Sequence, residues 1–456
     1  MNPQRVTRGV LLVLALASPS MAAVAQVLAS TCTAHAAVAT AATQPPLANG
    51  KRQSCIELRA AAVYSSPAVQ QAIERLRKSL SADTRVVAAQ QQDRAARAAQ
   101  EIAFGEIERL INDDRANPFA YWFYKPQHRL DEVFVPGGKY AASNPDTVFR
   151  VISMDPNGRY ELRGQFLSTT RPSYFSLHLM GARNPSGKER DAGVFFDTQI
   201  VTDAAGRFSI AIDSAASSAG PNHLRLLPDS TGVLVRDTLE DWATELPVAL
   251  TVTRTDAVAS RTKSAEQLIE EVVANIDRAA HTVPAFRDDL FFASPVNMLP
   301  PPAAHISGNW ALATSGNFAL ERGEALVFTL DPGAARYLGV QSGDILTGTI
   351  EPERRTSTLN NRQVHHNPDG TITYVLAPTD PGVGNWIDTG GVARGIVMIR
   401  WQGLPQQTPE QWRGVRGSTV VRIDQLPALL KQQGIVLPLS AVQDRYSLYM
   451  RRYSGW

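Results

Sequence analysis

The sequence predicts a mainly β protein with added helices. Two antiparallel β-sandwich domains of jelly-roll-like type follow an N-terminal helical segment and are joined by a bridging helix. Three observations lead to this prediction. Between residues 121 and 254, short alternating segments recur roughly every 8–12 residues and are separated by Gly, Pro, Asn and Asp, as in sandwiches and barrels. Segments on either side place apolar residues three or four positions apart, as helices do. A second strand-rich block, 317–401, repeats the first.

The chain begins with the pattern of a secretory signal peptide. Arg5 and Arg8 precede an apolar stretch at residues 9–17, and residues 23–25 supply the small side chains of a cleavage site. The apolar stretch is too short to span a bilayer, and no later segment reaches the roughly 18 apolar residues that a membrane helix needs. We therefore expect a periplasmic or secreted protein with no transmembrane segment in the mature chain.

The sequence contains two cysteines, Cys32 and Cys55. In an oxidising compartment they could form one disulfide that pins the N-terminal arm to the rest of the protein. This pairing requires cleavage of the signal peptide at Ala25, because cleavage at the second small-residue site around Ala36 would remove Cys32.

The charge balance argues against two classes of partner. The 456 residues include 45 basic and 43 acidic side chains, for a formal net charge of +2, and the two signs are interspersed. No basic tract occurs, so nucleic acid and anionic membranes are poor candidates as partners. The length of the mature chain is typical of two or three domains.

The helical segments are predicted from their apolar stripes. Residues 33–50 have no apolar periodicity and are expected to form a flexible leader. A stripe marks a first helix, and a long Ala- and Gln-rich helix is expected after a break at residues 81–83. A bridging helix is predicted at residues 263–280. The stripe of the first helix contains Val69, Ile73, Leu76 and Leu80, and that of the bridging helix contains Leu268, Val272, Ile276 and Ala279.

An internal repeat relates the two strand-rich blocks at an offset of about 164 residues. Three collinear stretches match, and the best explanation is a duplicated β-domain. Features shared by both copies are expected to be architectural: the "DAAG" and "NPDG" segments form tight turns, and the matched asparagines bond the backbone. The matched pairs are Tyr174 with Tyr337, Gln199 with Gln363, Gly206 with Gly370, Asn222 with Asn385, and Gly232 with Gly395.

Positions that differ between the copies are candidates for specialised function. In the stretch "DPGVGNWIDTGG", Trp386 and Asp388 occupy the places of His223 and Arg225 in the first copy. A tryptophan beside a carboxylate suits a ligand platform that combines stacking with a hydrogen-bond acceptor. The structural alternative is a tryptophan that closes one end of the sandwich and an aspartate that caps its own turn.

The C-terminal block resembles a known family. "STLNNRQVHHNPDGTITYVLAPTDPGVGNWIDTGGVARGIVMIRW" is similar to the C-terminal signature of the bacterial domain of unknown function 1214 family, and "SNPDTVFR" resembles the Asn-x-Asp-Thr segment of that family and the related family 1254. The likeness covers roughly residues 115–455, with Gly384 in place of the usual Pro and Thr358 interrupting a Ser-Leu-Asn step. It implies paired β-sandwich domains in an exported protein and no agreed reaction.

The search for catalytic motifs leaves a short list of candidates. No Gly-x-Ser-x-Gly elbow or phosphate-binding loop occurs. His365 and His366 are adjacent on a predicted strand, so they point to opposite faces and do not chelate one metal together. We expect no metal or other cofactor. Asp380 and Asp388 flank the tryptophan and are candidates for acid/base catalysis.

Further polar residues are candidates for ligand binding. Arg355 and Asn360 precede a predicted strand and could bind a carboxylate or a hydroxyl-rich ligand, or could form a solvated edge. In the first domain, Asn144, Asp146 and Arg150 open a strand, where a structural turn is expected. The aromatic stretch at residues 119–124 is expected to fill a domain interface, or alternatively to line a pocket between domains.

These observations give three functional hypotheses. The first is a protein that binds a small, partly apolar or sugar-like ligand near Trp386 or between the sandwiches, with Asn385, Asp388, Arg355 and Asn360 as further contacts. The alternatives are a glycoside- or ester-type hydrolase using Asp380 or Asp388, and a structural envelope protein. Each of the three is compatible with an oligomer.

The same observations divide the chain into seven segments. The predicted divisions are 1–25 signal peptide, 26–65 flexible leader, 66–116 helical segment, 117–257 first β-sandwich, 258–300 linker helix and Pro-rich connector, 301–405 second β-sandwich, and 406–456 C-terminal tail with short helices.

Overall fold

A computed structural model gives the fold of the chain. The signal peptide, the cysteine at position 32 and the second helix expected in the C-terminal tail lie wholly or almost wholly outside the residues that it describes. The described residues are 24, 50–130, 132–138, 140–167, 169–183, 189–216, 220–258, 263–304, 311–405 and 412–439.

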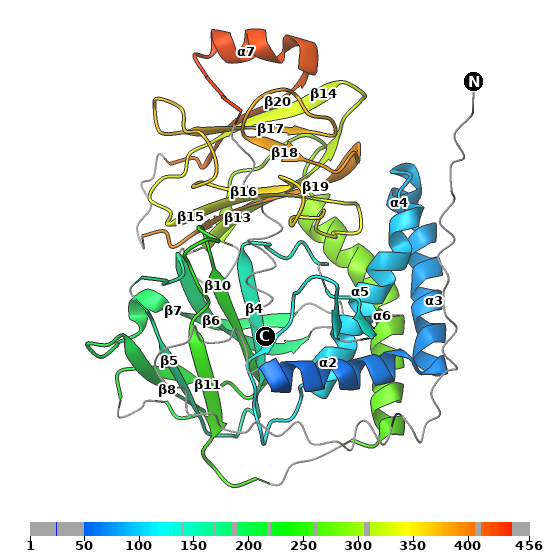
Figure 1. The fold of residues 1–456 in the computed structure, drawn as a ribbon, viewed down its shortest axis with the longest axis vertical. Helices are drawn as coiled ribbons and strands as arrows, with labels where there is room; N and C mark the ends of the chain where they lie inside the picture. The colour runs from blue at the N-terminus through cyan, green and yellow to red at the C-terminus, as the bar shows by residue number, and fades with distance from the viewer. Residues whose placement is uncertain are drawn as a thin grey trace, which may run out of the picture.

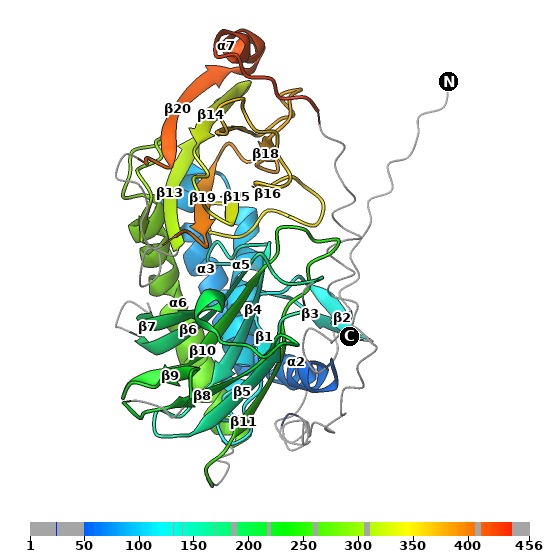
Figure 2. The same ribbon diagram turned by 90° about the vertical axis from the view of Figure 1, so that its left-hand side faces the viewer.

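The protein consists of two β-sandwiches stacked end to end, with a layer of helices along one side (Figures 1 and 2). The longest helix, α6 (Ala265–Phe291), follows the first sandwich and runs up to the second (Figure 1). The mainly β class, the paired antiparallel sandwiches and the bridging helix are therefore as the sequence predicts.

The first sandwich contains a five-stranded and a four-stranded sheet, ordered β1-β4-β10-β6-β7 and β11-β5-β8-β9. All pairs are antiparallel except β8 with β9. The aliphatic and aromatic side chains between the sheets form its core. The strands are β1 (Tyr121–Trp122), β4 (Thr147–Ser153), β5 (Tyr160–Gln165), β6 (Tyr174–Arg183), β7 (Glu189–Phe196), β8 (Arg207–Asp213), β9 (His223–Arg225), β10 (Ser230–Thr238) and β11 (Ala249–Arg254), and a separate hairpin joins β2 (His128–Leu130) to β3 (Val133–Val135).

The second sandwich has the same arrangement, with sheets ordered β12-β13-β19-β15-β16 and β18-β17-β14-β20. Its one parallel pair is β17 with β18, the counterpart of β8 with β9. The helix α7 (Leu426–Gln432) packs on its outer end. The strands are β12 (Ala303–Ala304), β13 (Ala311–Ala319), β14 (Glu324–Leu330), β15 (Tyr337–Gly343), β16 (Thr358–Asn360), β17 (Ile372–Ala377), β18 (Trp386–Asp388), β19 (Arg394–Gln402) and β20 (Val415–Arg422).

The register of the strands confirms the internal repeat. Tyr174 begins β6 opposite Thr238, and Tyr337 begins β15 opposite Gln402. The prediction that Gly232 matches Gly395 is wrong by one residue, because the β10 and β19 registers are related by an offset of 164. The extra residue lies in the turn before the strand, where an insertion adds little loop-closure entropy.

The two matched turns offer a stability prediction. Gly206 and Gly370 both have positive φ, +75° and +82°, which an L-residue adopts at a cost of about 1–2 kcal/mol. A Cβ at Gly206 would lie 2.2 Å from the carbonyl oxygen of Phe166, whereas one at Gly370 meets nothing within 4 Å. Gly206→Ala is therefore expected to lower the free energy of unfolding by at least about 1 kcal/mol more than Gly370→Ala, measured by urea denaturation. Equal losses would contradict this account.

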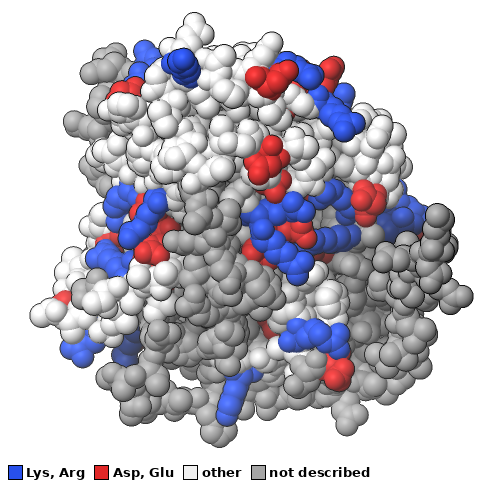
Figure 3. Space-filling model, turned by 45° about the horizontal axis from the view of Figure 1, so that its top comes forward, with Lys and Arg blue, Asp and Glu red and all other residues white. Residues whose placement is uncertain are grey.

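The outer surface carries mixed charge. On the face shown in Figure 3, Lys and Arg lie beside Asp and Glu in small groups, and wide uncharged areas separate them. Among the described residues, no helix is both long enough and apolar enough to cross a bilayer.

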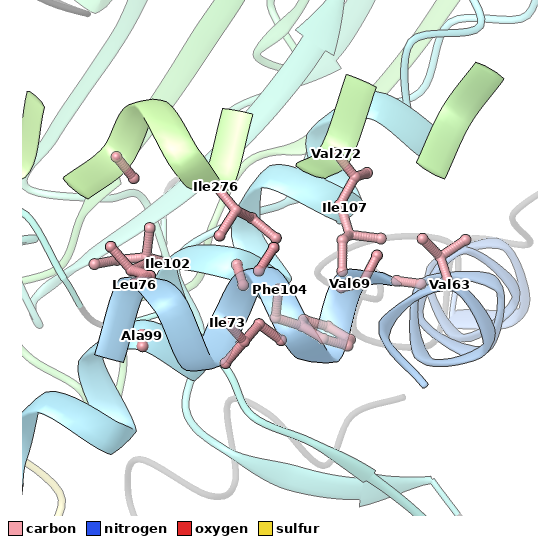
Figure 4. Close-up of a cluster of buried hydrophobic side chains, with 14 of the residues drawn as sticks. Val63, Val69, Ile73, Leu76, Ala99, Ile102, Phe104, Ile107, Val272 and Ile276 are labelled. Carbon is pink, nitrogen blue, oxygen red and sulfur yellow. The ribbon is translucent and has the colours of Figure 1, made fainter. Parts of the chain in front are cut away.

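The helical layer has a core of its own (Figure 4). Buried aliphatic side chains of α3, α5 and α6 interdigitate there, as the predicted stripes require. Asp83 caps α4 by accepting hydrogen bonds from the backbone N–H groups of Arg85 and Val86. The remaining helices are α2 (Gly50–Tyr64), α3 (Pro67–Ala82), α4 (Thr84–Ala88) and α5 (Ala95–Ile111).

The N-terminal and helical boundaries differ from the prediction in three places. Residues 50–64, expected within the flexible leader, form α2; its buried stripe was missed because Gln53 and Glu57 interrupt it with polar side chains. The long helix expected after residue 83 is split into α4 and α5 by Gln90, whose φ is +57°. The bridging helix continues eleven residues beyond 280, to Phe291, and contains Pro284.

The strand assignments differ in three places as well. The stretch "QIVTD" at residues 199–203 forms no strand, and β7 occupies a stretch that the sequence pattern did not indicate. Residues 415–422 belong to the second sandwich as β20, although they were expected in the C-terminal tail. All the side chains of this edge strand are exposed or half-buried, without a regular alternation, which explains why it was missed.

Candidate functional site

Trp386 lies at the outer end of the second sandwich and is packed against it. The side chain is partly buried against a cluster that includes Val375, Leu426 and Leu437, which belong to β17, α7 and the segment after α7. The indole N–H donates to the carbonyl oxygen of Ala377 at 3.0 Å. Both the apolar face and the polar edge of the ring are thus engaged within the protein.

The carboxylates beside Trp386 also have protein partners. Asp388 accepts a hydrogen bond from Arg355 at 3.1 Å and one from the backbone N–H of Gly390 at 2.7 Å. Asp380 caps its own turn by accepting from the backbone N–H of Gly382 at 2.8 Å. Arg355 also pairs with Glu351 at 2.9 Å. Asp388 and Arg355 therefore form an ion pair, whereas the hydrogen bond of Asp380 is to the backbone of its own turn.

Asn385 bonds the backbone on three sides. Its Oδ1 accepts from His365 N at 2.8 Å, and its Nδ2 donates to the carbonyl oxygens of His365 and Thr373. Asn222 makes the matching bonds to Val201 and Ser209 in the first sandwich. These bonds hold the loop that precedes each parallel strand.

Asn360 lies far from the tryptophan loop, at the contact between the two sandwiches. Its Nδ2 donates to Asp146 Oδ2 at 3.1 Å and to the carbonyl oxygen of Glu240 at 3.0 Å. The Tyr337 hydroxyl donates to the same Asp146 Oδ2 at 3.0 Å and lies 3.0 Å from Asn144 Nδ2. All four side chains are at most 4% exposed. The structure thus separates Asn360 from the other predicted ligand contacts and joins it to the residues that open β4.

Near this contact, each sandwich has side chains that point away from its own core. Alternate residues of β6 and β10 point away from the first core, and alternate residues of β15 and β19 point away from the second. We call these residues the intersandwich face. They are Tyr174, Ser176, His178 and Arg236 of the first sandwich, and Tyr337, Gln341, Arg400 and Gln402 of the second.

The intersandwich face contains buried polar atoms that have no hydrogen-bond partner among the described residues. They are the hydroxyl oxygens of Tyr174 and Ser176 and the Oε1 of Gln402, on side chains that are at most 5% exposed. The guanidinium of Arg336, next to Tyr337, lies 5.8 Å from the Tyr174 ring centroid, which places Tyr174 against the second sandwich. Buried polar groups in folded proteins are nearly always hydrogen-bonded, so these atoms are exceptions within this part of the structure. The Tyr174 and Ser176 hydroxyls interact with each other, which leaves the other hydrogen-bonding capacity of the pair unused.

The same face carries two arginines related by the repeat. Arg236 Nη1 lies 2.9 Å from His178 Nδ1, and Arg400 Nη1 donates to Gln341 Oε1 at 2.9 Å, from corresponding positions of the two sheets. The pKa of Arg400 is lowered to about 10, chiefly by burial; Tyr337 and Asp146 oppose this decrease, and the charge of Arg236 adds to it. Burial also raises the pKa of the Tyr337 hydroxyl well above its usual value, and Asp146 adds to this increase.

Ion pairs hold the two sandwiches in this relation. Asp197, just after β7, is fully buried and accepts two hydrogen bonds from Arg336 of the second sandwich, at 2.7 and 2.8 Å. Arg171 adds a third at 3.1 Å. Arg362 pairs with Asp241 at 3.2 Å across the same contact. The intersandwich face is therefore positioned by charge-assisted bonds on either side of it.

Of the predicted ligand contacts, Asn360 lies at the contact between the sandwiches, and the sequence analysis singled out Tyr174 and Tyr337 as matched positions but missed the arginine pair. The signal was present: each copy has an arginine within an otherwise apolar strand, "VLVRD" and "VMIRW". Matching Gly232 with Gly395 aligned Arg236 with an isoleucine and concealed the pair. Among the described residues, no group of three or more His, Cys, Asp or Glu side chains is arranged to hold a metal.

The comparisons with known proteins support the fold. No family model and no curated protein matches the chain. The chain is similar to the crystal structure of an uncharacterized protein from Burkholderia cenocepacia, with 22% identity and a TM-score of 0.65 over 80% of this chain and 99% of that one. The VPA0106 protein from Vibrio parahaemolyticus aligns with a TM-score of 0.37 and 9% identity over 62% of this chain and 90% of that one, which is too weak for a structural argument. The first comparison shows the fold alone.

Proposed function

We propose that this chain is an exported protein that binds a small ligand between its two β-sandwiches, at the intersandwich face. The observation that carries the proposal is the set of buried polar atoms of Tyr174, Ser176 and Gln402, which have no hydrogen-bond partner among the described residues apart from the contact of the Tyr174 and Ser176 hydroxyls with each other. Tyr174 lies against Arg336 of the second sandwich, so this set is at the junction of the two sandwiches. Leaving such a group without a hydrogen bond costs about 1–3 kcal/mol, so a ligand that bonds to them gains affinity. Ligands commonly bind at interfaces between domains.

Export is proposed from the N-terminal sequence and is supported by a disulfide. Cys55 on α2 is disulfide-bonded, and the other cysteine of the sequence, Cys32, lies outside the described residues. Disulfides persist in oxidising compartments such as the periplasm. Membership of the domain of unknown function 1214 family is likewise a proposal. It is supported by the meeting of two of the resembling segments, because Asp146 of "SNPDT" and Asn360 of the Ser-Leu-Asn step share a hydrogen bond.

A ligand screen with matched variants tests the site. The protein is purified from the periplasm, analysed by native mass spectrometry for a retained small molecule, and screened by thermal shift against amino acids, sugars and short carboxylic acids. Tyr174→Phe and Ser176→Ala are expected to weaken binding of any hit about fivefold or more.

Tyr374→Phe is the matched control, because Tyr374 is also buried with an unbonded hydroxyl but lies in the second core, stacked on Phe328. It is expected to leave binding unchanged, as is Trp386→Phe. Binding that depends on Trp386 and not on Tyr174 would contradict the proposed site and would place the ligand at the loop that contains Trp386. Turnover of a bound ester or glycoside, lost in Asp388→Asn, would favour the hydrolase instead.

A further inference from the structure

We infer that His128 fastens the β2–β3 hairpin to helix α2 in a pH-dependent way: the contact is closed while the imidazole carries two protons and is weakened when it loses one. The contact involves none of the residues of the intersandwich face, so the inference does not depend on the proposed function. Three observations carry it: the two oxygens that the imidazole meets, the ionised state of the carboxylate among them, and the burial of the charges around that carboxylate.

The hairpin lies beside α2 and packs on the helical layer (Figure 2). Val135 of β3 is fully buried in the core of that layer, and Leu130 of β2 packs against it. His128, at the start of β2, is opposite Val135 in the strand register, and its ring reaches Glu57 of α2. The imidazole therefore joins the hairpin to the helix by a polar contact in addition to the apolar packing.

Both ring nitrogens of His128 meet oxygens that can only accept a hydrogen bond. Nδ1 lies 3.0 Å from the carbonyl oxygen of Pro126, and Nε2 lies 3.1 Å from Glu57 Oε2. A neutral imidazole has one N–H group and one acceptor nitrogen, whereas the imidazolium has two N–H groups. In either neutral tautomer, one of the two contacts would set lone pairs against each other. The imidazolium satisfies both contacts.

Glu57 acts as a carboxylate in this contact. Its Oε1 accepts from Gln53 Nε2 at 2.8 Å and lies 3.3 Å from Lys125 Nζ. The Gln53 amide is oriented by Trp122, whose backbone N–H donates to Oε1 and whose carbonyl oxygen accepts from Nε2. Burial would raise the pKa of Glu57, but Lys125 and His128 lower it overall. The proton between Glu57 and His128 therefore belongs to the imidazole.

The charges around Glu57 make the proton of His128 important. Lys125 is shared between two buried carboxylates, Glu57 at 3.3 Å and Glu108 of α5 at 2.5 Å. A protonated His128 supplies a second positive charge beside Glu57. Titratable side chains also come from β1 and from the hairpin itself: Tyr121, whose hydroxyl lies 2.8 Å from Lys125 Nζ, and Arg129 and Glu132, which pair with each other at 3.2 Å.

The direction of the pH dependence follows from these contacts. The side chain of His128 is 25% exposed, so it exchanges protons with solvent, whereas that of Glu57 is 3% exposed. Imidazoles in general change charge between about pH 5 and 8. Loss of the proton sets lone pairs against each other at one contact and leaves a buried carboxylate less well compensated. The contact is therefore closed at the acid end of this range and weakened at the alkaline end.

Amide hydrogen exchange of the full-length protein, followed by mass spectrometry at about pH 5.5 and about pH 8 and corrected for the intrinsic pH dependence of exchange, tests the inference. Protection of the β2 and β3 amides in the wild type is expected to fall with rising pH by a factor about tenfold larger than in His128→Gln. Equal pH dependence of hairpin protection in the two proteins would overturn the inference.

Two further variants sharpen the comparison. In Glu57→Gln, the new amide can donate to a neutral His128 Nε2 while Nδ1–H donates to Pro126, so the hairpin is expected to stay protected at about pH 8. A loss of protection as large as that of the wild type would contradict the account. His223→Gln is the matched control, because His223 Nε2 meets Asp213 at 3.0 Å in the first sandwich. It is expected to show the pH dependence of the wild type.

Histidine-selective ¹⁵N NMR of the full-length protein counts the protons directly, and it decides together with His128→Gln if Glu57→Gln does not fold. The signals of His128 are assigned by their absence in His128→Gln. Both of its ring nitrogens are expected to be protonated at about pH 5.5, and one of them at about pH 8. An unprotonated ring nitrogen at about pH 5.5, in a protein whose hairpin is protected from exchange, would overturn the inference.

Discussion

Replacing Lys125 with methionine is expected to lower the free energy of unfolding by about 3–5 kcal/mol, because it leaves two buried carboxylates without their cation. The Nζ of Lys125 lies 2.5 Å from Glu108 Oε1 and 3.3 Å from Glu57 Oε1, and it donates to the Tyr121 hydroxyl at 2.8 Å. All three charged side chains are at most 3% exposed. The cluster joins α2 and α5 to the start of the first sandwich.

Urea denaturation of Lys125→Met beside Lys78→Met measures this effect. Lys78 lies 3.8 Å from Glu74 with its side chain 70% exposed, so its loss is expected to cost less than about 1 kcal/mol. Similar small losses in both variants would mean that the carboxylates of the Lys125 cluster are solvated or protonated at the pH of measurement.

The same cluster gives a pH dependence with a definite sign. Burial raises the pKa of Glu108 to about 7; Lys125 opposes this increase and Glu57 adds to it. Burial would also raise the pKa of Glu57, but Lys125 and His128 lower it overall. Because the folded protein binds the Glu108 proton more tightly than the unfolded chain, the stabilisation from this group is complete below about pH 4.5 and is lost as the pH rises to about 7.

Glu108→Gln removes this titrating group. Its free energy of unfolding is therefore expected to decline less between pH 4.5 and 7 than that of the wild type, as followed by urea midpoints across that range. A steeper decline in the variant would show that Glu108 is ionised throughout the range and that its pKa is low.

Replacing Arg150 with methionine is expected to cost a similar amount, about 3–5 kcal/mol. Arg150 Nη2 donates to Asp237 Oδ2 at 2.7 Å inside the first sandwich, with side-chain exposures of 2% and 0%. Burial raises the pKa of Asp237, and Arg150 opposes the increase. Without Arg150 the pKa of Asp237 rises further, so the cost of the substitution is expected to be smaller at pH 5 than at pH 7.5.

A double substitution distinguishes the lost ion pair from lost packing. Asp237 Oδ1 accepts from the backbone N–H of Val248 at 2.8 Å, and Asp237→Asn retains an oxygen for this bond while removing the charge. The variant with both Arg150→Met and Asp237→Asn is expected to be more stable than Arg150→Met alone by about 1–2 kcal/mol. If the double variant is the less stable of the two, the destabilisation comes from packing and not from the unpaired charge.

The second sandwich shows how this position is filled without charge. By the strand register, Thr314 and Trp401 stand where the first sandwich has Arg150 and Asp237. Trp401 is fully buried in the second core. The duplicated fold therefore tolerates either a buried ion pair or an apolar side chain at this point, which agrees with the weak net contribution of buried ion pairs to stability.

The fold could be predicted from the sequence to the extent that its signals are local. Alternating strands and turn glycines gave the two sandwiches, and the asparagine turns were assigned correctly because their bonds repeat in both copies. The intersandwich face depends on contacts between distant residues, such as Asp146 with Asn360, which are 214 positions apart. The spacing of apolar and polar residues along the sequence does not reveal such a contact.

For Trp386, a local sequence pattern was present but was compatible with two different roles. A tryptophan between glycines and aspartates gives the same local pattern whether it stacks on a ligand or on the protein. Helix α7 and the segment after it pack against Trp386, and this partner lies about 40 residues further along the chain. The local sequence around Trp386 therefore carried too little information to choose between the two roles.

The most direct test is a crystal structure of the protein with the ligand found by native mass spectrometry, or with the strongest hit of the thermal-shift screen if none is retained. We predict ligand density between the sandwiches, in hydrogen-bond contact with the Tyr174 and Ser176 hydroxyls. Density against Trp386 and Asp388, with an unliganded and closely packed intersandwich face, would contradict the account.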